Sequence, residues 1–263
     1  MVARIVRLSL TPIKGTALHH PESLRLTASG AEGDRAFFLA TEDDRLISIF
    51  RTGAVAHVRA EYDAGRSELA LFDGRRELCR GTTGAGVPVA VDFYGERIVT
   101  GRHVDGPWDA VFSGLLGRPV RLVRADHANG GIDEEPATLL GTASIAAVGR
   151  QLGEPVDGRR FRMLIEVETT EPHAEDTWRG ALLAGDEVQL RVGGPVLRCA
   201  AVTRHPDTGT RDQDVLRAIK QYRGVVTSER SRGLCFGVYA GVVAGGTLRT
   251  GEVLRVVGPS SDP

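Results

Sequence analysis

The chain has few cysteines, almost no lysine and no long apolar run. Its three cysteines, Cys79, Cys199 and Cys235, are far apart and form no C-x-x-C pair, which excludes a disulfide framework and a site built from four thiolates. Only Lys14 and Lys220 are lysines among the 33 basic residues. No segment of about 18 apolar residues is present, and the arginine-containing amino terminus does not fit a signal peptide. We therefore expect a cytoplasmic protein with no membrane association.

A charge excess of one sign is also missing. The 33 basic residues face 34 acidic ones, and the apolar share of 41% and charged share of 25% are ordinary for a globular protein. This balance excludes a general polyanion binder, so no nucleic acid partner is expected. The motifs G-x-S-x-G, Walker A and H-E-x-x-H are absent, as is a G-x-G-x-x-G that follows a strand.

The sequence pattern that is present predicts a mainly β fold of the α+β class. Glycine contributes 33 of 263 residues, well above the average share of about 7%, which indicates many tight turns between short strands. Three covering helices are expected at 108–116, 144–152 and 212–222, which stop at Gly117, Gly153 and Gly224. Alternation of apolar and polar residues predicts strands at 4–10, 23–26, 35–39, 56–62, 68–72, 161–168, 187–192, 235–243 and 252–257.

The length fits one large domain or two modest ones, at about 150 residues per domain. Glycine and proline cluster near residues 85–110, which places the expected boundary in that region. We expect a smaller amino-terminal β-rich domain at 1–95, a second domain at 96–258 and a tail at 259–263.

One cysteine lies in a chemically suggestive stretch, which runs R-C-A-A-V-T-R-H-P-D-T-G-T-R-D from Arg198 to Asp212. Arg198, Arg204 and Arg211 are close in sequence to Cys199, and nearby guanidinium charge favours a thiolate over a thiol. A thiolate is both a nucleophile and a ligand for soft metals. From composition alone, a buried and inert cysteine remains the competing interpretation.

The same stretch resembles the signature of the MOSC domain family, approximately R-C-x-x-T-T-V-D-P-x-T-G. The segment F-G-V-Y-A-G-V-V-A-G-G-T-L-R-T-G-E-V from Phe236 resembles the closing strands of that family, and Arg160-Phe-Arg162 with the later E-D-x-W resembles another of its marks. Upstream, P-I-K-G at 12–15, G-D-R at 33–35 and the residues up to Arg51 resemble the amino-terminal β-barrel domain that accompanies MOSC. The resemblance covers nearly the whole chain and is strongest to bacterial relatives of the mitochondrial amidoxime reducing component.

The resemblance implies a MOSC β-barrel and a β-rich partner domain that together hold molybdenum cofactor, a molybdopterin with Mo. Cys199 would be the protein ligand to the metal. The anionic cofactor needs arginine and lysine side chains and backbone donors. Hydroxyls and amides at the expected helix start are suited to its phosphate. The cofactor-binding residues implied in this way are Lys14, Arg35, Arg51, Thr142, Ser144, Arg162 and Arg198.

The implied activity is reduction of a small N-hydroxylated or other N-oxygenated compound. Cys199 would act through the metal, and Asp207 is a candidate for proton handling, with capping of its own turn as the alternative. Three scattered cysteines cannot build a ferredoxin cluster, and no flavin fingerprint is visible. The electrons would therefore come from a separate reductase or electron-transfer protein.

The chain departs from the family pattern at Gly15, Gly141, Met163, Leu164 and His205, several of which fall in the implied cofactor shell. Two other functions follow from Cys199. In the first, the chain is a sulfur carrier or cofactor-handling protein with a persulfide on Cys199. In the second, it is a metal-free enzyme with Cys199 as nucleophile.

Overall fold

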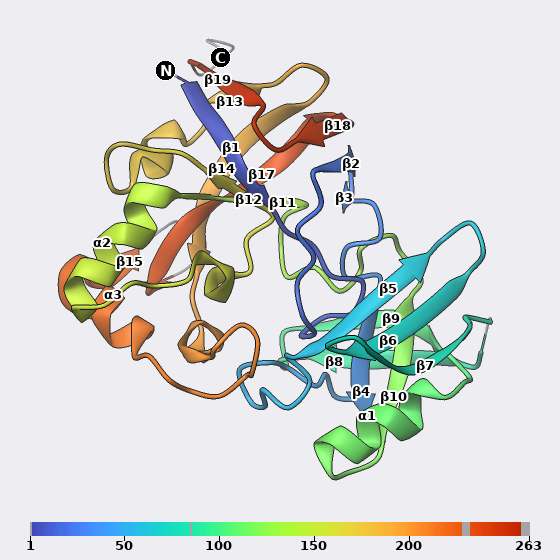
Figure 1. Cartoon of the computed structure of the whole chain (residues 1–263). Helices are drawn as coiled ribbons and strands as arrows, with labels where there is room; N and C mark the ends of the chain where they lie inside the picture. The colour runs from blue at the N-terminus through green and yellow to red at the C-terminus, as the bar shows by residue number, and fades with distance from the viewer. Residues whose placement is uncertain (1, 85, 228–231, 259–263) are drawn as a thin grey trace.

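The computed structural model describes residues 2–84, 86–227 and 232–258, and it shows two β-rich units side by side (Figure 1). The prediction of a mainly β fold is confirmed, because strands dominate and the described residues contain only three α-helices. Among these residues, no helix has both the length and the apolar character needed to cross a bilayer.

The second unit is a closed barrel. Its strands follow one another around the barrel in the order β1 (Val2–Leu8), β12 (Ile165–Val167), β11 (Ala137–Gly141), β17 (Cys235–Ala244), β14 (Gln189–Leu197), β13 (Leu182–Ala184) and β19 (Val253–Val257). Neighbouring strands are antiparallel except β11 and β12. The alternation in β1 turns Ala3 and Ile5 into the barrel core, beside Leu190 and Leu254. Closure removes the exposed sheet edges and gives a rigid wall for a site.

The first unit contains two antiparallel sheets and a covering helix. One sheet has the order β4 (Phe37–Thr41), β10 (Val120–Ala125), β9 (Arg97–His103) and β8 (Pro88–Phe93). The other has the order β5 (Val58–Asp63), β6 (Glu68–Asp73) and β7 (Arg76–Thr82). Helix α1 (Trp108–Leu116) buries Trp108 and Phe112 against Phe37 and Leu39 between them. This core fixes the turns of the first unit that face the barrel.

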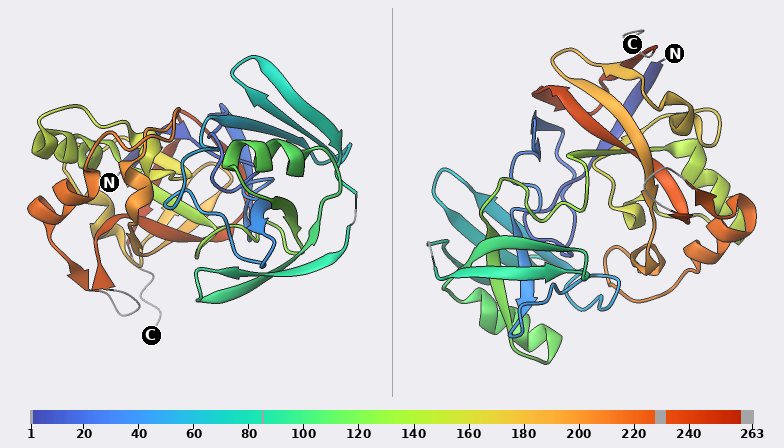
Figure 2. Two further views of the ribbon diagram at one scale, coloured as in Figure 1. Left: turned by 90° about the horizontal axis from the view of Figure 1, so that it is seen from below. Right: turned by 180° about the vertical axis from the view of Figure 1, so that it is seen from behind.

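Small elements join and cover the two units. A short sheet pairs β18 (Gly246–Arg249) with β2 (Ser23–Thr27), and β2 with β3 (Gly30–Ala31). Helices α2 (Thr142–Leu152) and α3 (Val215–Arg223) pack together beside the barrel, as the two views of Figure 2 show. The remaining short elements are the pair β15 (Val226–Thr227) and β16 (Arg232–Gly233) and the 3-10 turns η1 (Gly158–Phe161), η2 (Ala174–Trp178) and η3 (Ala200–Thr203).

The strand pairing divides the chain at a different place from the expected boundary between residues 95 and 96. That position lies in the turn of the β8–β9 hairpin, and β9, α1 and β10 all belong with β4 in the first unit. Strand β1, in contrast, is part of the barrel. Because hydrogen-bonded neighbours share one core, we propose a boundary near residue 126, with β1 as an outlying strand of the second domain. The expected tail at 259–263 lies outside the described residues.

The expected strand at 161–168 is wrong in its first half. Only Ile165–Val167 form β12, whereas Phe161 ends η1 and Arg162 adopts a left-handed backbone with φ 52°. The alternating pattern of apolar residues could not reveal this turn. Its effect is to aim the Arg162 side chain away from the barrel wall and toward the first unit.

Candidate functional site

A cavity of about 470 Å3 lies between the two units. This volume is within the range of about 300–1,000 Å3 that small-molecule sites occupy. The first unit contributes the segments around Lys14, Arg35, Phe50 and Tyr94, and the barrel unit contributes the end of β14 and the turn that contains Arg162. The charged residues in its lining are Lys14, Arg35, Arg97, Arg160, Arg162, Arg198, Asp34, Glu96, Asp133, Glu134 and Glu135.

Cys199 lines this cavity and is the exposed cysteine of the three. It follows the last residue of β14 by two positions and stands at the start of η3, with extended backbone angles. Cys79 is half-buried and Cys235 is buried. Burial raises the pKa of the Cys79 thiol to about 11 and also raises that of Cys235. Cys199 is therefore the thiol suited to meet a ligand.

Arg162 brings a half-buried positive charge into the cavity. Its Nη2 donates to the Thr16 carbonyl oxygen at 2.7 Å, and no described carboxylate lies within 4.0 Å of its guanidinium. Burial, together with the nearby charge of Arg35, lowers the pKa of Arg162 to about 9. The negative charges of Asp34 and Asp133 offset this effect only in part, so a bound anion would further favour the charged form of Arg162.

Arg198 is a second fixed cation, on the same side as Cys199. Its three nitrogens donate to the Phe236 carbonyl at 3.0 Å, the Phe161 carbonyl at 3.1 Å and the Met163 Sδ at 2.7 Å. The guanidinium carbon also lies 5.4 Å from the centre of the Phe161 ring. Burial lowers the pKa of Arg198 to about 10. These neutral acceptors hold the group in one orientation without cancelling its charge.

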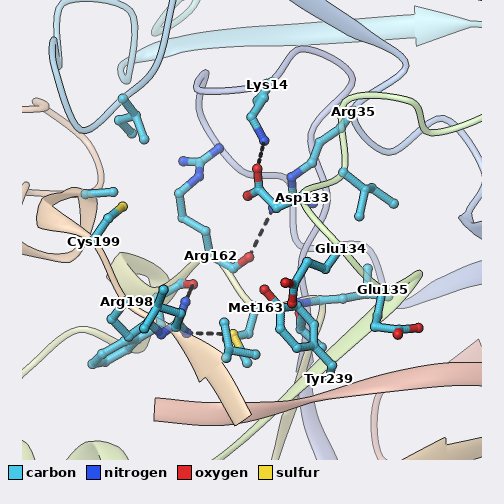
Figure 3. Close-up of a pocket in the computed structure, with 18 of the residues that line it drawn as sticks. Lys14, Arg35, Asp133, Glu134, Glu135, Arg162, Met163, Arg198, Cys199 and Tyr239 are labelled. Carbon is cyan, nitrogen blue, oxygen red and sulfur yellow. Dashed lines mark hydrogen bonds and ion pairs between the residues drawn. The ribbon is translucent and has the colours of Figure 1, made fainter. Parts of the chain in front are cut away.

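Lys14 and Asp133 form an ion pair across from Cys199. The Nζ of Lys14 donates to Asp133 Oδ1 at 2.7 Å and to the Gly131 carbonyl at 2.8 Å. Burial lowers the pKa of Lys14. Burial also opposes ionisation of Asp133, yet Lys14, Arg35 and Arg97 together hold its pKa below the ordinary value. The Asp133 side chain is 57% exposed because it projects into the cavity. Figure 3 shows Arg162 between this pair and Cys199.

Several cavity residues were not anticipated from the sequence. Tyr94 donates to Asp133 Oδ1 at 3.5 Å, and burial raises the pKa of both Tyr94 and Tyr239 far above the usual range. Both phenols therefore keep their protons and act as donors. The acidic run at 133–135 is a signal that could have drawn attention to Asp133. The two tyrosines lie in unrelated strands and turns, so their meeting needed the fold.

The cavity offers hydrogen-bond donors that suit an anionic group. Ser48 is 4% exposed and lines the cavity, and its buried Oγ has no partner among the described residues. This hydroxyl is a buried donor left without an acceptor, in a cavity that also contains the guanidiniums of Arg162 and Arg198. No group of three or more His, Cys, Asp and Glu in the described part of the chain could hold a metal ion.

The structure brings together five of the nine residues that the sequence singled out, namely Cys199, Lys14, Arg35, Arg162 and Arg198. The other four are outside the cavity lining. Arg51 is exposed beside the Phe50 ring, and Asp207 accepts two hydrogen bonds from Arg159 at 2.7 and 2.8 Å.

Thr142 and Ser144 lie at the start of α2, where an internal carboxylate already occupies the helix terminus. Ser144 Oγ donates to Glu175 Oε1 at 2.7 Å and accepts from the His173 amide at 2.8 Å. Thr142 Oγ1 accepts from the Thr169 amide at 3.1 Å. A Cβ on Gly141 would lie 2.7 Å from Glu175 Oε2, so glycine at this position leaves room for that carboxylate.

Comparison with known proteins identifies the class. Residues 126–255 match the model of the MOSC domain, which places a MOSC domain in this part of the chain. The match begins directly after β10, where the strand pairing separates the two units.

Curated relatives agree with this class. The chain is similar to human mitochondrial amidoxime-reducing component 1, with 32% identity over 130 residues that cover 48% of this chain and 38% of the human protein. It is 32% identical to the bovine mitochondrial amidoxime reducing component 2 over 124 residues, or 46% and 36% of the two chains. It is 23% identical to the molybdenum cofactor sulfurase of Caenorhabditis elegans over 253 residues, or 89% and 33%. The matched regions span about a third of the length of these relatives.

Proposed function

We propose that this chain binds molybdenum cofactor in the cavity between its units and reduces small N-oxygenated compounds with electrons from a separate protein. The observation that carries the proposal is the exposed thiol of Cys199 in the same cavity as two half-buried guanidiniums, those of Arg162 and Arg198, which have no ion-pair partner among the described carboxylates. The similarity to amidoxime-reducing components supports the reaction class, and the residues between β1 and residue 126 would then be the accompanying amino-terminal domain.

The residues of the cavity can be assigned to the parts of such a cofactor by their chemistry. Cys199 would supply the thiolate ligand to molybdenum. Arg162, Arg198, Arg35 and Lys14 would hold the anionic groups, and Ser48 Oγ offers a further donor. When bound, the cofactor supplies two-electron redox chemistry.

The chain itself would orient the substrate and control protons. The overall reaction, R–NHOH + 2 e⁻ + 2 H⁺ → R–NH₂ + H₂O, consumes two protons in a partly enclosed cavity. Lys14 Nζ carries a proton that burial makes easier to release, and Asp133 Oδ1 accepts from it at 2.7 Å. The hydroxyl of Tyr94, which also lines the cavity, adds a further polar atom to this chain. Asp207 is outside the cavity and is replaced in this proposal by the Lys14–Asp133 pair.

The reaction is tested with protein purified from a host that makes the cofactor. Dithionite-reduced protein is mixed with benzamidoxime, and benzamidine formation is measured by chromatography. We expect turnover that is lost in Cys199→Ala and kept in Cys79→Ala, because Cys79 lies in β7 outside the cavity lining. Cofactor-loaded wild-type protein that forms no benzamidine, and no reduced product from other N-hydroxylated compounds, would contradict the proposed reaction.

A second candidate function is sulfur transfer through a Cys199 persulfide. It is favoured by the similarity to a molybdenum cofactor sulfurase along 89% of this chain and by the exposure of the Cys199 thiol. Treatment of the purified protein with cyanide would then release thiocyanate in an amount equal to the protein, and Cys199→Ala would release none. The reductase proposal predicts no such release.

A further inference from the structure

Three arginines surround Phe50 at the edge of the cavity. Nη2 of Arg204 donates to the Phe50 carbonyl oxygen at 3.2 Å, and Nη2 of Arg211 donates to the same oxygen at 3.4 Å. The guanidinium carbon of Arg51 lies 5.5 Å from the centre of the Phe50 ring. No described carboxylate lies within 4.0 Å of any of these guanidiniums. Arg51, Arg204 and Arg211 are called the rim cluster below.

The backbone holds these like charges together. A Cβ on Gly53 would lie 1.9 Å from the Gly209 carbonyl oxygen, so the loops of the two units meet backbone to backbone. Arg204 Nη1 donates to that same carbonyl at 2.8 Å, and Arg204 and Arg211 are antiparallel bridge partners. Held side by side, the charges repel one another, and a bound negative surface would relieve the repulsion.

Acidic residues of the same loop do not neutralise the rim cluster. Asp207 is engaged by both terminal nitrogens of Arg159, and Asp212 by those of Arg160 at 2.7 and 2.6 Å. The whole chain has a net charge of −1, so the concentration of positive charge is local. Such a patch on a balanced surface steers an oppositely charged partner to one place.

The rim cluster also lies next to the cavity that contains Cys199. Phe50, whose carbonyl and ring it surrounds, lines the cavity together with Cys199. Arg204 and Arg211 lie in the segment that follows Cys199 directly in the chain. Figure 2 shows this segment, in orange, beside the blue loop of the first unit that contains Phe50. The guanidiniums themselves are outside the cavity lining, where a small substrate would not reach them but a docked protein would.

We propose that the rim cluster is the docking surface for the electron donor, a small electron-transfer protein with an acidic face around its redox centre. This inference rests on the proposed function. Each turnover needs two electrons, so two reduced one-electron carriers would dock in succession. Each carrier is oxidised by one electron. The two electrons and two protons cleave the substrate N–O bond and release water.

The test compares two electron donors on the cofactor-loaded enzyme. Dithionite needs no docking surface, whereas an acidic [2Fe–2S] ferredoxin, kept reduced by its reductase, does. The main variant is Arg211→Glu, because Arg211 is exposed and makes one weak hydrogen bond at 3.4 Å. Arg204→Gln is the second variant. The matched control is Arg66→Glu in the β5–β6 turn, which Figure 1 places away from the cavity loops.

With ferredoxin, we expect kcat/KM of Arg211→Glu to fall about tenfold or more at low salt, while the Arg66→Glu enzyme stays within about twofold of wild type. Salt should reduce the wild-type rate and affect the variant less. The Kd of oxidised ferredoxin, measured by calorimetry, should rise in parallel. Arg204→Gln should show a smaller fall with ferredoxin than Arg211→Glu, because it removes a charge without reversing it. Dithionite-driven turnover should be the same in all four proteins.

The remaining outcomes contradict either the docking surface or the proposed function. Equal ferredoxin rates and Kd values in wild type and Arg211→Glu, or no ferredoxin binding to wild type at low salt, overturn the docking surface. A wild-type enzyme that reduces the substrate with neither donor would overturn the proposed function instead. A fall with both donors in Arg211→Glu alone would assign Arg211 to the catalytic site and not to docking.

Discussion

Arg35 donates a hydrogen bond from Nη2 to the main-chain carbonyl of Arg162 at 3.1 Å, and both residues have a left-handed backbone, with φ of 50° and 52°. One arginine comes from the first unit and the other from the turn before β12. A left-handed backbone is unfavourable for arginine, and such strain concentrates at functional sites. This hydrogen bond therefore joins the two units beside the cavity that both arginines line.

Arg162→Gln should separate cofactor binding from stability. The substitution removes a buried charge whose pKa is already lowered to about 9, so the cofactor-free protein should melt at the same temperature as wild type or slightly above it. Molybdenum content should fall about tenfold or more, since a charge-assisted hydrogen bond contributes about 1.5–3 kcal/mol. Arg159→Gln, in the same turn but paired with Asp157 and Asp207, is the matched control and should keep its molybdenum. Unchanged molybdenum in Arg162→Gln would remove Arg162 from the cofactor site.

Ser144→Ala should lower the stability of the protein and leave its molybdenum content unchanged, the opposite of the result expected for Arg162→Gln. The buried hydroxyl bonds Glu175 and the His173 amide, so its loss leaves a buried carboxylate oxygen without its donor. The free energy of unfolding, from urea denaturation, should fall by about 1–3 kcal/mol. Molybdenum per folded chain should match wild type. The exposed Ser29 provides the control, as Ser29→Ala should leave the stability unchanged. Loss of molybdenum without loss of stability would instead restore the cofactor role that the sequence indicated for Ser144.

His173 should make the folded protein sensitive to mild acid. Burial, helped by Arg223, lowers its pKa from 6.5 to about 4, so the folded protein keeps it neutral while the unfolded chain takes up a proton below about pH 6.5. The contribution of neutral His173 is therefore complete above pH 6.5 and is lost as the pH falls toward 4, by about 3 kcal/mol at most.

Urea denaturation of wild type and His173→Asn at pH 7.5 and pH 5 measures this contribution. Asparagine tolerates the left-handed backbone of residue 173, with φ 62°. The decrease in unfolding free energy between the two pH values should be smaller in the variant. An identical decrease in both proteins would show that His173 does not titrate as described.

The sequence predicted the parts of the site that depend on local signals. Helix 108–116 was placed at its observed bounds, because Gly117 ends it in a left-handed conformation. Cys199 and the basic residues Lys14, Arg35, Arg162 and Arg198 were identified through a family resemblance and do meet in one cavity. No local pattern could place Asp133 beside Lys14, since 118 residues separate them and the ion pair exists only when the units are joined.

Two other sequence predictions, the domain boundary and the phosphate site at 142–144, depend on contacts that a single sequence does not show. Thr142 and Ser144 stand at a helix start, as expected, and the Ser144 hydroxyl there donates to Glu175, which comes from a distant part of the chain. The boundary at 95–96 followed the glycine and proline content, which marks the turns of a hairpin as readily as a linker. Strand pairing between distant segments decides such questions, and a single sequence does not show it.

The most direct test of the account is the molybdenum content of freshly purified protein from a cofactor-producing host. Elemental analysis should find close to one molybdenum per wild-type chain and per Cys79→Ala chain, and almost none per Cys199→Ala chain, while the thermal stability of the cofactor-free proteins stays similar. Wild-type protein without molybdenum from such a host, or Cys199→Ala protein that retains it, would contradict the central claim that this thiol and the surrounding arginines hold the cofactor.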